Sequence, residues 1–276
     1  MLVNSKEVLL EAKKGGYAVP APDFIDLDSA RAYCKTAEKL KKPVILSFAQ
    51  AHSEVISLHE AALIGKFMAE EVSVPVVLHL DHGTDIAFIK EAIELGFTSV
   101  MIDASMMDFD TNVKMTKEVV EYAHARNVTV EAEIGHVGSG ENYENHDNSD
   151  SIYTTKEEAK RFVELTDVDS LAVSIGTAHG IYKGGKPALS FDTLHEIRDE
   201  VSVPLVLHGG SGTGDDNLKR CAKEGISKIN VFTDFLVSAM NQIDIDKPKD
   251  YLALKVSSNK GMMNTLEHYY GVFETK

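Results

Sequence analysis

Two stretches of the chain, SVPVVLHLDHG (residues 73–83) and SVPLVLHGGSG (residues 202–212), share one pattern. In each, a proline precedes an apolar run, and the run ends near a histidine that is followed by glycine. Proline cannot continue a helix, and a short apolar run between such breakers is typical of a buried strand. The pattern therefore marks the point where a helix has ended and a buried strand begins.

The same alternation of strand and helix recurs along the whole chain. We predict eight strands, at residues 17–20, 44–48, 74–80, 99–102, 129–134, 170–175, 203–208 and 228–231. Apolar residues at three- and four-residue steps predict helices at residues 28–40, 58–71, 86–95, 111–125, 156–165, 192–201 and 215–224. Eight strand–helix units without a linker favour a closed (β/α)8 barrel over an open parallel sheet.

We therefore expect an α/β protein with a single TIM barrel domain over residues 1–276. After Phe235 the repeat gives way to helix-like sequence, so residues 235–276 are predicted to form a C-terminal helical extension. Such an extension suits an interface between copies of the chain and equally suits a part in the active site, and we expect a homodimer or homotetramer.

Composition limits the classes of partner. The 276 residues carry a formal net charge of −15, which disfavours a nucleic-acid partner. No segment approaches the roughly 18 consecutive apolar residues that would span a membrane. Cys34 and Cys221 lack CxxC spacing and are interpreted as idle thiols in a reducing compartment. We expect a cytoplasmic protein that binds a small molecule.

Polar residues gather at the carboxyl ends of the predicted strands, where parallel barrels carry their catalytic groups. In chain order the residues at these ends are Asp23, Ala49 and Gln50, Asp81 and His82, Asp103, Glu133, His179, His208 and Asn230, all polar except Ala49. Three of them are histidines followed by glycine. Three imidazoles from separate strands, with carboxylates nearby, predict a divalent metal site with an open position, and zinc is the first choice.

Asp81 directly precedes one of the predicted ligands. That position suits a proton shuttle, and it also suits a carboxylate that orients a metal-bound histidine. The residues alone leave both roles open.

Two turns, one rich in glycine and one with polar residues, predict a phosphate site. Gly209–Gly212 follows the seventh strand and residues 230–233 follow the eighth, the usual place where backbone N–H groups of a barrel bind phosphate. Lys183 adds a positive charge nearby in sequence to His179. A phosphorylated substrate is therefore expected.

The strings LHLDHG, GFTSVMIDAS, VEAEIG, DSLAVSIGTAHGIYKG, PLVLHGGSG and KINVFT occur in this order between Val74 and Asp234. With these motifs the chain closely resembles the class II, zinc-dependent ketose-bisphosphate aldolases, the family of fructose- and tagatose-bisphosphate aldolases. The resemblance implies reversible cleavage of a ketose 1-phosphate or ketose 1,6-bisphosphate to dihydroxyacetone phosphate and an aldehyde.

The resemblance also implies roles for single residues. Zinc would be bound by His82, His179 and His208, with the carboxylates of Glu133 and Asp103 near it or at a second metal position. Asp81 would move a proton on the C4 oxygen, Asn230 would stabilise the enediolate, and Glu141 would exchange the C1 proton of dihydroxyacetone phosphate. The phosphate would be held by Gly180, Lys183, Gly209, Ser211, Asn230 and Thr233, beside a monovalent cation such as Na⁺ or K⁺.

The departures from the family pattern concern the aldehyde half of the substrate. Many members read AFN after the first strand and place a serine after the second, where this chain has Asp23 and the pair Ala49–Gln50. Phe232 replaces an aspartate of the fructose-specific branch, and the arginine expected in the C-terminal helix is not evident at residues 255–268. These motifs leave the aldehyde undetermined.

Two other functions are compatible with the residues. A metal-dependent sugar-phosphate epimerase or isomerase would use the same barrel, ion and carboxylates without releasing a triose. A non-catalytic barrel that binds sugar phosphate or pairs with an active subunit would bind the metal without turnover, and the altered Asp23 and Ala49 give this alternative some weight.

Overall fold

The computed structural model describes residues 1–135, 138–139, 153–179 and 186–276. Its central sheet contains eight parallel strands that form a ring. They are β2 (Val19–Pro22), β3 (Val44–Ala49), β4 (Val76–Gly83), β5 (Ser99–Ile102), β6 (Thr129–Ile134), β8 (Ser170–Val173), β10 (Leu205–Leu207) and β11 (Ile226–Val231). β11 pairs with β2, and a bridge between Asp23 and Ser47 joins the end of β2 to β3. The predicted α/β barrel is confirmed.

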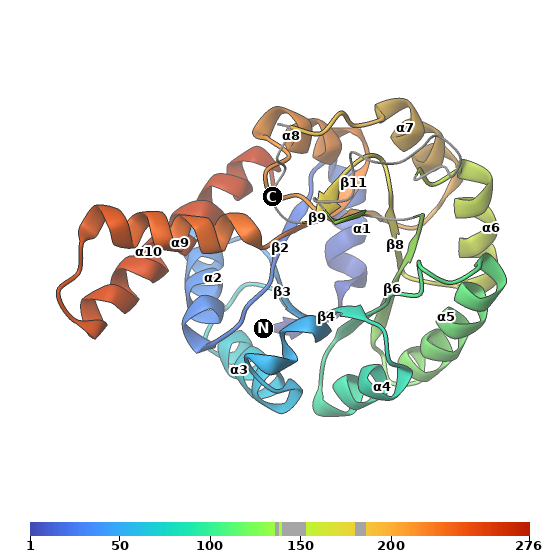
Figure 1. The fold of residues 1–276 in the computed structure, drawn as a ribbon. Coiled ribbons are helices and arrows are strands. Elements are labelled where there is room, and N and C mark those ends of the chain that lie inside the picture. The colour runs from blue at the N-terminus through green and yellow to red at the C-terminus, as the bar shows by residue number, and fades with distance from the viewer. Residues whose placement is uncertain (136–137, 140–152, 180–185) are drawn as a thin grey trace.

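Among the described residues, seven helices alternate with the strands, and Figure 1 shows them on the outside of the ring. They are α2 (Leu27–Leu40), α3 (Leu58–Glu70), α4 (Ile86–Leu95), α5 (Phe109–His124), α6 (Lys156–Thr166), α7 (Phe191–Glu200) and α8 (Asp215–Glu224). Each predicted helix lies within two residues of the observed bounds. The boundaries could be predicted because side-chain caps fix the starts: Asp26, Ser57 and Thr155 each accept the N–H of the third helical residue.

The strands are buried along their whole length rather than on alternate residues. This is the pattern of a parallel sheet that has packed side chains on one face and helices on the other. The repeat does not predict α1 (Ser5–Gly15), which contributes Val8, Leu9 and Ala12 to a cluster with the first residues of β2, β3 and β4. α1 therefore closes the amino-terminal end of the barrel, opposite the strand ends that carry the polar residues. The short strand β1 (Leu2–Val3) pairs with the start of β4.

Beyond the eighth barrel strand, α9 (Thr233–Asp246) and α10 (Tyr251–Val272) form a helical hairpin, with Pro248 in the connection. The connection between the two helices extends away from the barrel on the left of Figure 1, whereas the later residues of α10, including Leu266 and Tyr270, are buried in the main core. At the mouth of the ring, β7 (Gly138–Ser139) pairs in parallel with β9 (Ala178–His179). None of the helices in the described ranges is both long and apolar enough to cross a membrane.

Candidate active site

A cavity of about 660 Å³ opens at the carboxyl ends of the barrel strands. It is lined by most of the predicted site residues: Asp23, Ala49, Gln50, Asp81, His82, Asp103, Glu133, Gly209, Ser211, Asn230, Phe232 and Thr233. His208 lies fully buried in contact with His82. The fold therefore brings together residues that are up to 210 positions apart in sequence, from Asp23 to Thr233.

Some predicted residues lie outside what the structure describes. Glu141, Gly180 and Lys183 fall in the ranges that are not described. The backbone of His179 forms β9, but its side chain is not described.

A β-bulge directs two consecutive side chains toward the cavity. Leu80 pairs with Val100 of β5, but the next pair is Gly83 with Ile102, so β4 contains one extra residue at this point. In a regular strand Asp81 and His82 would point to opposite faces. The bulge, together with a left-handed backbone at His82 (φ 45°), places both at the cavity wall. Such strained backbone is tolerated mainly at functional sites.

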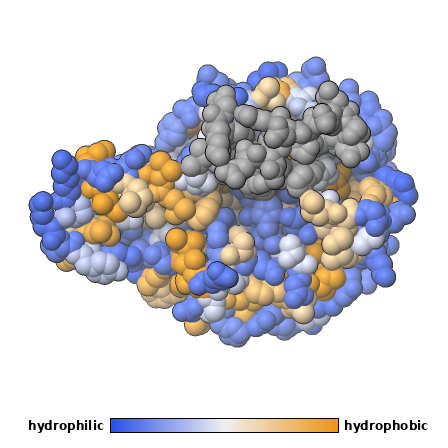
Figure 2. Space-filling view, viewed as in Figure 1, coloured by the Kyte–Doolittle hydropathy of each residue, from blue (hydrophilic) through white to orange (hydrophobic). Residues whose placement is uncertain are grey.

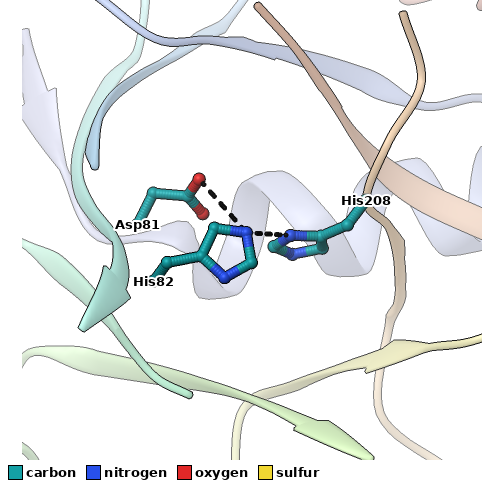
Figure 3. A group of neighbouring side chains, drawn as sticks. All are labelled: Asp81, His82 and His208. Carbon is teal, nitrogen blue, oxygen red and sulfur yellow. Dashed lines mark hydrogen bonds and ion pairs between the residues drawn. The ribbon is translucent and has the colours of Figure 1, made fainter. Parts of the chain in front are cut away.

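Carboxylates fix the orientation of both described imidazoles. His82 Nδ1 donates to Asp103 Oδ2 at 2.8 Å, and His208 Nε2 donates to Glu131 Oε1 at 2.9 Å. The remaining ring nitrogens, His82 Nε2 and His208 Nδ1, face each other at 2.9 Å (Figure 3). When neither of these facing nitrogens carries a proton, their lone pairs can bind one ion, and the carboxylates on the outer nitrogens hold the rings in that orientation.

This donor set fits a divalent cation. Two nitrogens that bind one zinc ion at about 2.0–2.1 Å each must lie within about 4 Å of one another, and these two do. Burial opposes a charge on His82, but Asp81, the hydrogen bond to Asp103 and the charge of Glu133 outweigh it and raise the pKa of His82 to about 10. The same carboxylates favour a metal cation at this position.

Asp81 is held in its ionised form beside the paired imidazoles. Its Oδ1 accepts a hydrogen bond from Asn230 Nδ2 at 2.9 Å, and its Oδ2 lies 3.8 Å from His82 Nε2. Burial disfavours the charged form, but the positive charges of His82, His208 and Lys228 offset it and hold the pKa of Asp81 below its usual value. Figure 3 shows the carboxylate directed at the space between the rings.

Three buried residues beneath the cavity were not among the predicted site residues. Lys228 Nζ donates to both oxygens of Glu131, at 2.9 and 2.8 Å, and to His79 Nε2 at 3.1 Å. Glu131, His79 and Lys228 precede Glu133, Asp81 and Asn230 by two positions each. The two-residue period of a strand places such pairs on one face, so this signal was present in the sequence.

The turns after β10 and β11 meet at the side of the cavity predicted for phosphate. Ser211 Oγ accepts from the backbone N–H of Phe232 and Asp234, which ties the glycine turn to the first turn of α9. Gly209 has a left-handed backbone (φ 67°), and a Cβ there would meet the carbonyl oxygen of Ala178 at 2.5 Å. Glycine at this position lets the turn approach β9.

Comparisons with known proteins point to one enzyme family. The family model for class II fructose-bisphosphate aldolase matches residues 3–276. The chain is 35% identical to the D-tagatose-1,6-bisphosphate aldolase subunit GatY of Klebsiella oxytoca, over 98% of each chain. Among solved structures, the YdjI aldolase of Escherichia coli K12 has a TM-score of 0.90 at 33% identity, over 100% of this chain and 98% of that one. The fructose-bisphosphate aldolase of Campylobacter jejuni shares the fold, with a TM-score of 0.83 at 22% identity over 99% and 95% of the two chains.

Proposed function

The chain belongs to the class II fructose-bisphosphate aldolase family, and from this premise we propose that its cavity performs the family reaction with a zinc ion held by His82, His179 and His208. The reaction is the reversible cleavage of a phosphorylated ketose to dihydroxyacetone phosphate and an aldehyde. One observation carries the assignment of the site: His82 Nε2 and His208 Nδ1 converge at 2.9 Å beside the ionised carboxylate of Asp81.

When bound, the divalent ion supplies an electrophile for the ketose carbonyl oxygen. The protein contributes the orientation of the ligands. Asp103 and Glu131 hold the two imidazoles through their outer nitrogens, and carboxylates in that position typically raise the metal affinity of a histidine site. Glu133 lines the cavity and adds negative charge near the ion.

Asp81 is the proposed base for carbon–carbon cleavage. In the cleavage direction its carboxylate takes the proton of the C4 hydroxyl, the C3–C4 bond breaks, and the aldehyde forms at C4. Asn230 fixes the carboxylate through Oδ1, which leaves Oδ2 as the proton acceptor. The side-chain oxygen of Asn230 is buried and has no hydrogen-bond partner among the described residues. We propose that the amide of Asn230 also contacts the oxygens of the three-carbon fragment.

The fragment that leaves as dihydroxyacetone phosphate must then gain a proton at C1, its hydroxymethyl carbon. We assign this transfer to Glu141. Its sequence position supports the assignment, because Ser139, two residues earlier, pairs through its backbone with His179.

For the phosphate group, we propose Gly180, Lys183, Gly209, Ser211, Asn230 and Thr233, together with a monovalent cation such as Na⁺ or K⁺. Thr233 begins the 14-residue helix α9, and the first N–H groups of a helix attract anions. Ser211 connects these N–H groups to the glycine turn.

We also propose that the α9–α10 hairpin joins copies of the chain into a homodimer or homotetramer. The hairpin carries large apolar side chains that are 44–76% exposed: Val237, Met240, Ile245, Tyr251, Leu252 and Val256. Figure 2 shows apolar surface along this arm. Exposed apolar patches of this kind commonly mark protein interfaces. Light scattering of the purified chain, compared with a Met240→Glu/Leu252→Glu variant that should dissociate, tests the assembly.

The proposed chemistry is tested with the purified chain in two assays. Exchange of the C1 proton of dihydroxyacetone phosphate with deuterated water should be catalysed, should stop with a chelator and should return with zinc. Candidate ketose phosphates should release dihydroxyacetone phosphate in a coupled assay. Formation of an epimer without triose would instead identify an epimerase, and metal binding without exchange or cleavage would identify a binding barrel.

A further inference from the structure

We propose that the aldehyde half of the substrate carries no phosphate, so that the enzyme acts on ketose 1-phosphates in preference to ketose 1,6-bisphosphates. This inference rests on the proposed function and narrows its substrate class. It concerns one part of the cavity, the β2–β3 sector, which we define as Asp23, Ala49, Gln50, His52 and Phe232.

The β2–β3 sector is a continuous surface beside the proposed base. The bridge between Asp23 and Ser47 places the ends of β2 and β3 next to each other. The rings of His52 and Phe232 lie 4.5 Å apart, which connects the loop after β3 to the residue after β11. Phe232 borders the turn at Gly209–Gly212, where we place the first phosphate, through its N–H to Ser211 Oγ, whereas the other members of the sector come from the ends of β2 and β3.

No lysine or arginine lines the cavity among the described residues. The sequence of the ranges that are not described contains one lysine, Lys183, and no arginine. Lys183 is already assigned to the first phosphate. A second phosphate would need its own cationic partners, since a doubly charged group is costly to desolvate without them.

The charge in the sector has the wrong sign for a phosphate. Asp23 is 8% exposed, and its Oδ1 is buried with no hydrogen-bond partner in the described structure. When ionised, this carboxyl group repels a phosphate; when protonated, it donates to a hydroxyl oxygen. Burial and then the negative charge of Asp81 raise the pKa of Asp23, which favours the second state. The ionised state repels a second phosphate, and the protonated state offers it a single neutral donor and no positive charge.

The other side chains suit an uncharged, hydroxylated fragment. Burial lowers the pKa of His52, so the ring is neutral near pH 7, and its Nδ1 is buried without a partner among the described residues. Gln50 uses its side-chain oxygen to accept the N–H of Thr84 at 2.8 Å, which leaves its NH₂ group as a donor. Phe232 and Ala49 add apolar surface. These groups can bind hydroxyls and carbon, but they carry no positive charge.

Two lysines of the described structure are the candidate cations, and both are already paired: Lys228, whose charge acts on Asp23, is buried against Glu131, and Lys255 lies on α10. For Lys255 the partners are two aspartates. Its Nζ lies 2.5 Å from Asp28 Oδ2 and 3.6 Å from Asp26 Oδ2, at the start of α2. Two carboxylates therefore compensate its charge. If a phosphate does bind at the aldehyde side, Lys255 is the cation that would hold it. A variant of this residue is therefore part of the test.

The test measures condensation with dihydroxyacetone phosphate, using D-glyceraldehyde, L-glyceraldehyde and D-glyceraldehyde 3-phosphate as acceptors. At least one unphosphorylated aldehyde should have a kcat/KM about tenfold or more above that of the phosphorylated one. An equal or higher value for glyceraldehyde 3-phosphate would overturn the inference. Exchange of the C1 proton of dihydroxyacetone phosphate is measured in parallel: its absence would refute the proposed function itself, whereas exchange with a preference for the phosphorylated aldehyde would refute only the inference.

Variants at Gln50 and Lys255 test which residues set the preference between the two kinds of aldehyde. Gln50→Lys adds a cation to the β2–β3 sector and should raise the relative use of glyceraldehyde 3-phosphate by about tenfold, whereas Gln50→Met should not raise it. Lys255→Gln should leave the preference unchanged. A loss of phosphorylated-aldehyde use in Lys255→Gln would show that Lys255 binds the second phosphate and would contradict the inference.

Discussion

Lys228 donates hydrogen bonds to both carboxylate oxygens of Glu131 inside the barrel, where the two side chains are 1% and 2% exposed. Glu131 in turn accepts the N–H of His208. This chain of contacts fixes the imidazole with Nδ1 directed at His82. The buried ion pair therefore orients a proposed metal ligand from a position that the metal does not touch.

Replacing Lys228 should weaken both the fold and the metal site. Lys228→Met leaves the Glu131 carboxylate buried without its cation, which typically costs about 3–5 kcal/mol of unfolding free energy. Because Lys228 no longer fixes the Glu131 carboxylate that orients His208, zinc affinity should fall by about 10–100-fold. Chemical denaturation and competition with a chromophoric chelator measure the two effects.

The double variant Lys228→Met/Glu131→Gln separates these effects. It removes both charges and should recover much of the stability, but it should not recover the affinity, because a carboxylate no longer holds His208. Wild-type stability and affinity in the single variant would show that the ion pair has no positioning role.

Asp81 should be needed for cleavage but not for metal binding. Loss of a general base typically lowers kcat by about 10²–10⁴-fold, so Asp81→Ala should fall in this range while zinc affinity stays close to that of the wild type. Asp81→Asn is the matched control, since it keeps the shape but not the charge and should be equally slow. Full activity in either variant would remove the role of Asp81 as the base.

The pH dependence of stability should report His79. Burial, and then the charge of Lys228, lower the pKa of His79 to about 3, whereas the unfolded chain binds this proton near the ordinary value of 6.5. Between these values the unfolded state binds more protons, so stability falls as pH falls. A difference of one bound proton between the unfolded and folded states changes the free energy of unfolding by about 1.4 kcal/mol per pH unit.

Urea unfolding between pH 6 and pH 4 provides the measurement. The wild type should lose stability more steeply than His79→Gln over this range. Equal slopes for the two proteins would mean that His79 is protonated in the folded barrel.

Glu141→Ala should slow exchange of the C1 proton of dihydroxyacetone phosphate more strongly than it weakens binding of that ligand. We expect a fall of about 10²-fold or more in the exchange rate, as for a lost acid–base group. Glu144→Ala, in the same segment of the sequence, serves as the control and should exchange at the wild-type rate. Unchanged exchange in Glu141→Ala would assign the transfer to another group.

The helices and most strands could be predicted because their signals are local. Asp26, Ser57 and Thr155 begin helices by capping, and the apolar periods identify the helices that these caps start. Ring closure and the clustering of polar strand ends could then be inferred from the parallel repeat. The barrel and the neighbourhood of Asp81, His82 and His208 were therefore accessible from sequence alone.

Other features depend on contacts between distant residues. The bulge at Asp81 and His82 is defined by how β4 pairs with β5. The sequence of β4 alone therefore does not specify it. The pairing of Lys228 with Glu131 joins residues 97 positions apart and requires the closed ring. α1 also escaped prediction, because it precedes the strand–helix repeat that identified the other elements around the barrel.

The location of the metal tests the central claim most directly. Crystals grown with zinc and measured at the zinc absorption edge should show one strong anomalous peak within about 2.0–2.1 Å of His82 Nε2 and His208 Nδ1, with His179 as a further ligand. Active crystalline enzyme whose zinc peak lies away from these nitrogens, or which shows no peak at all, would contradict the account.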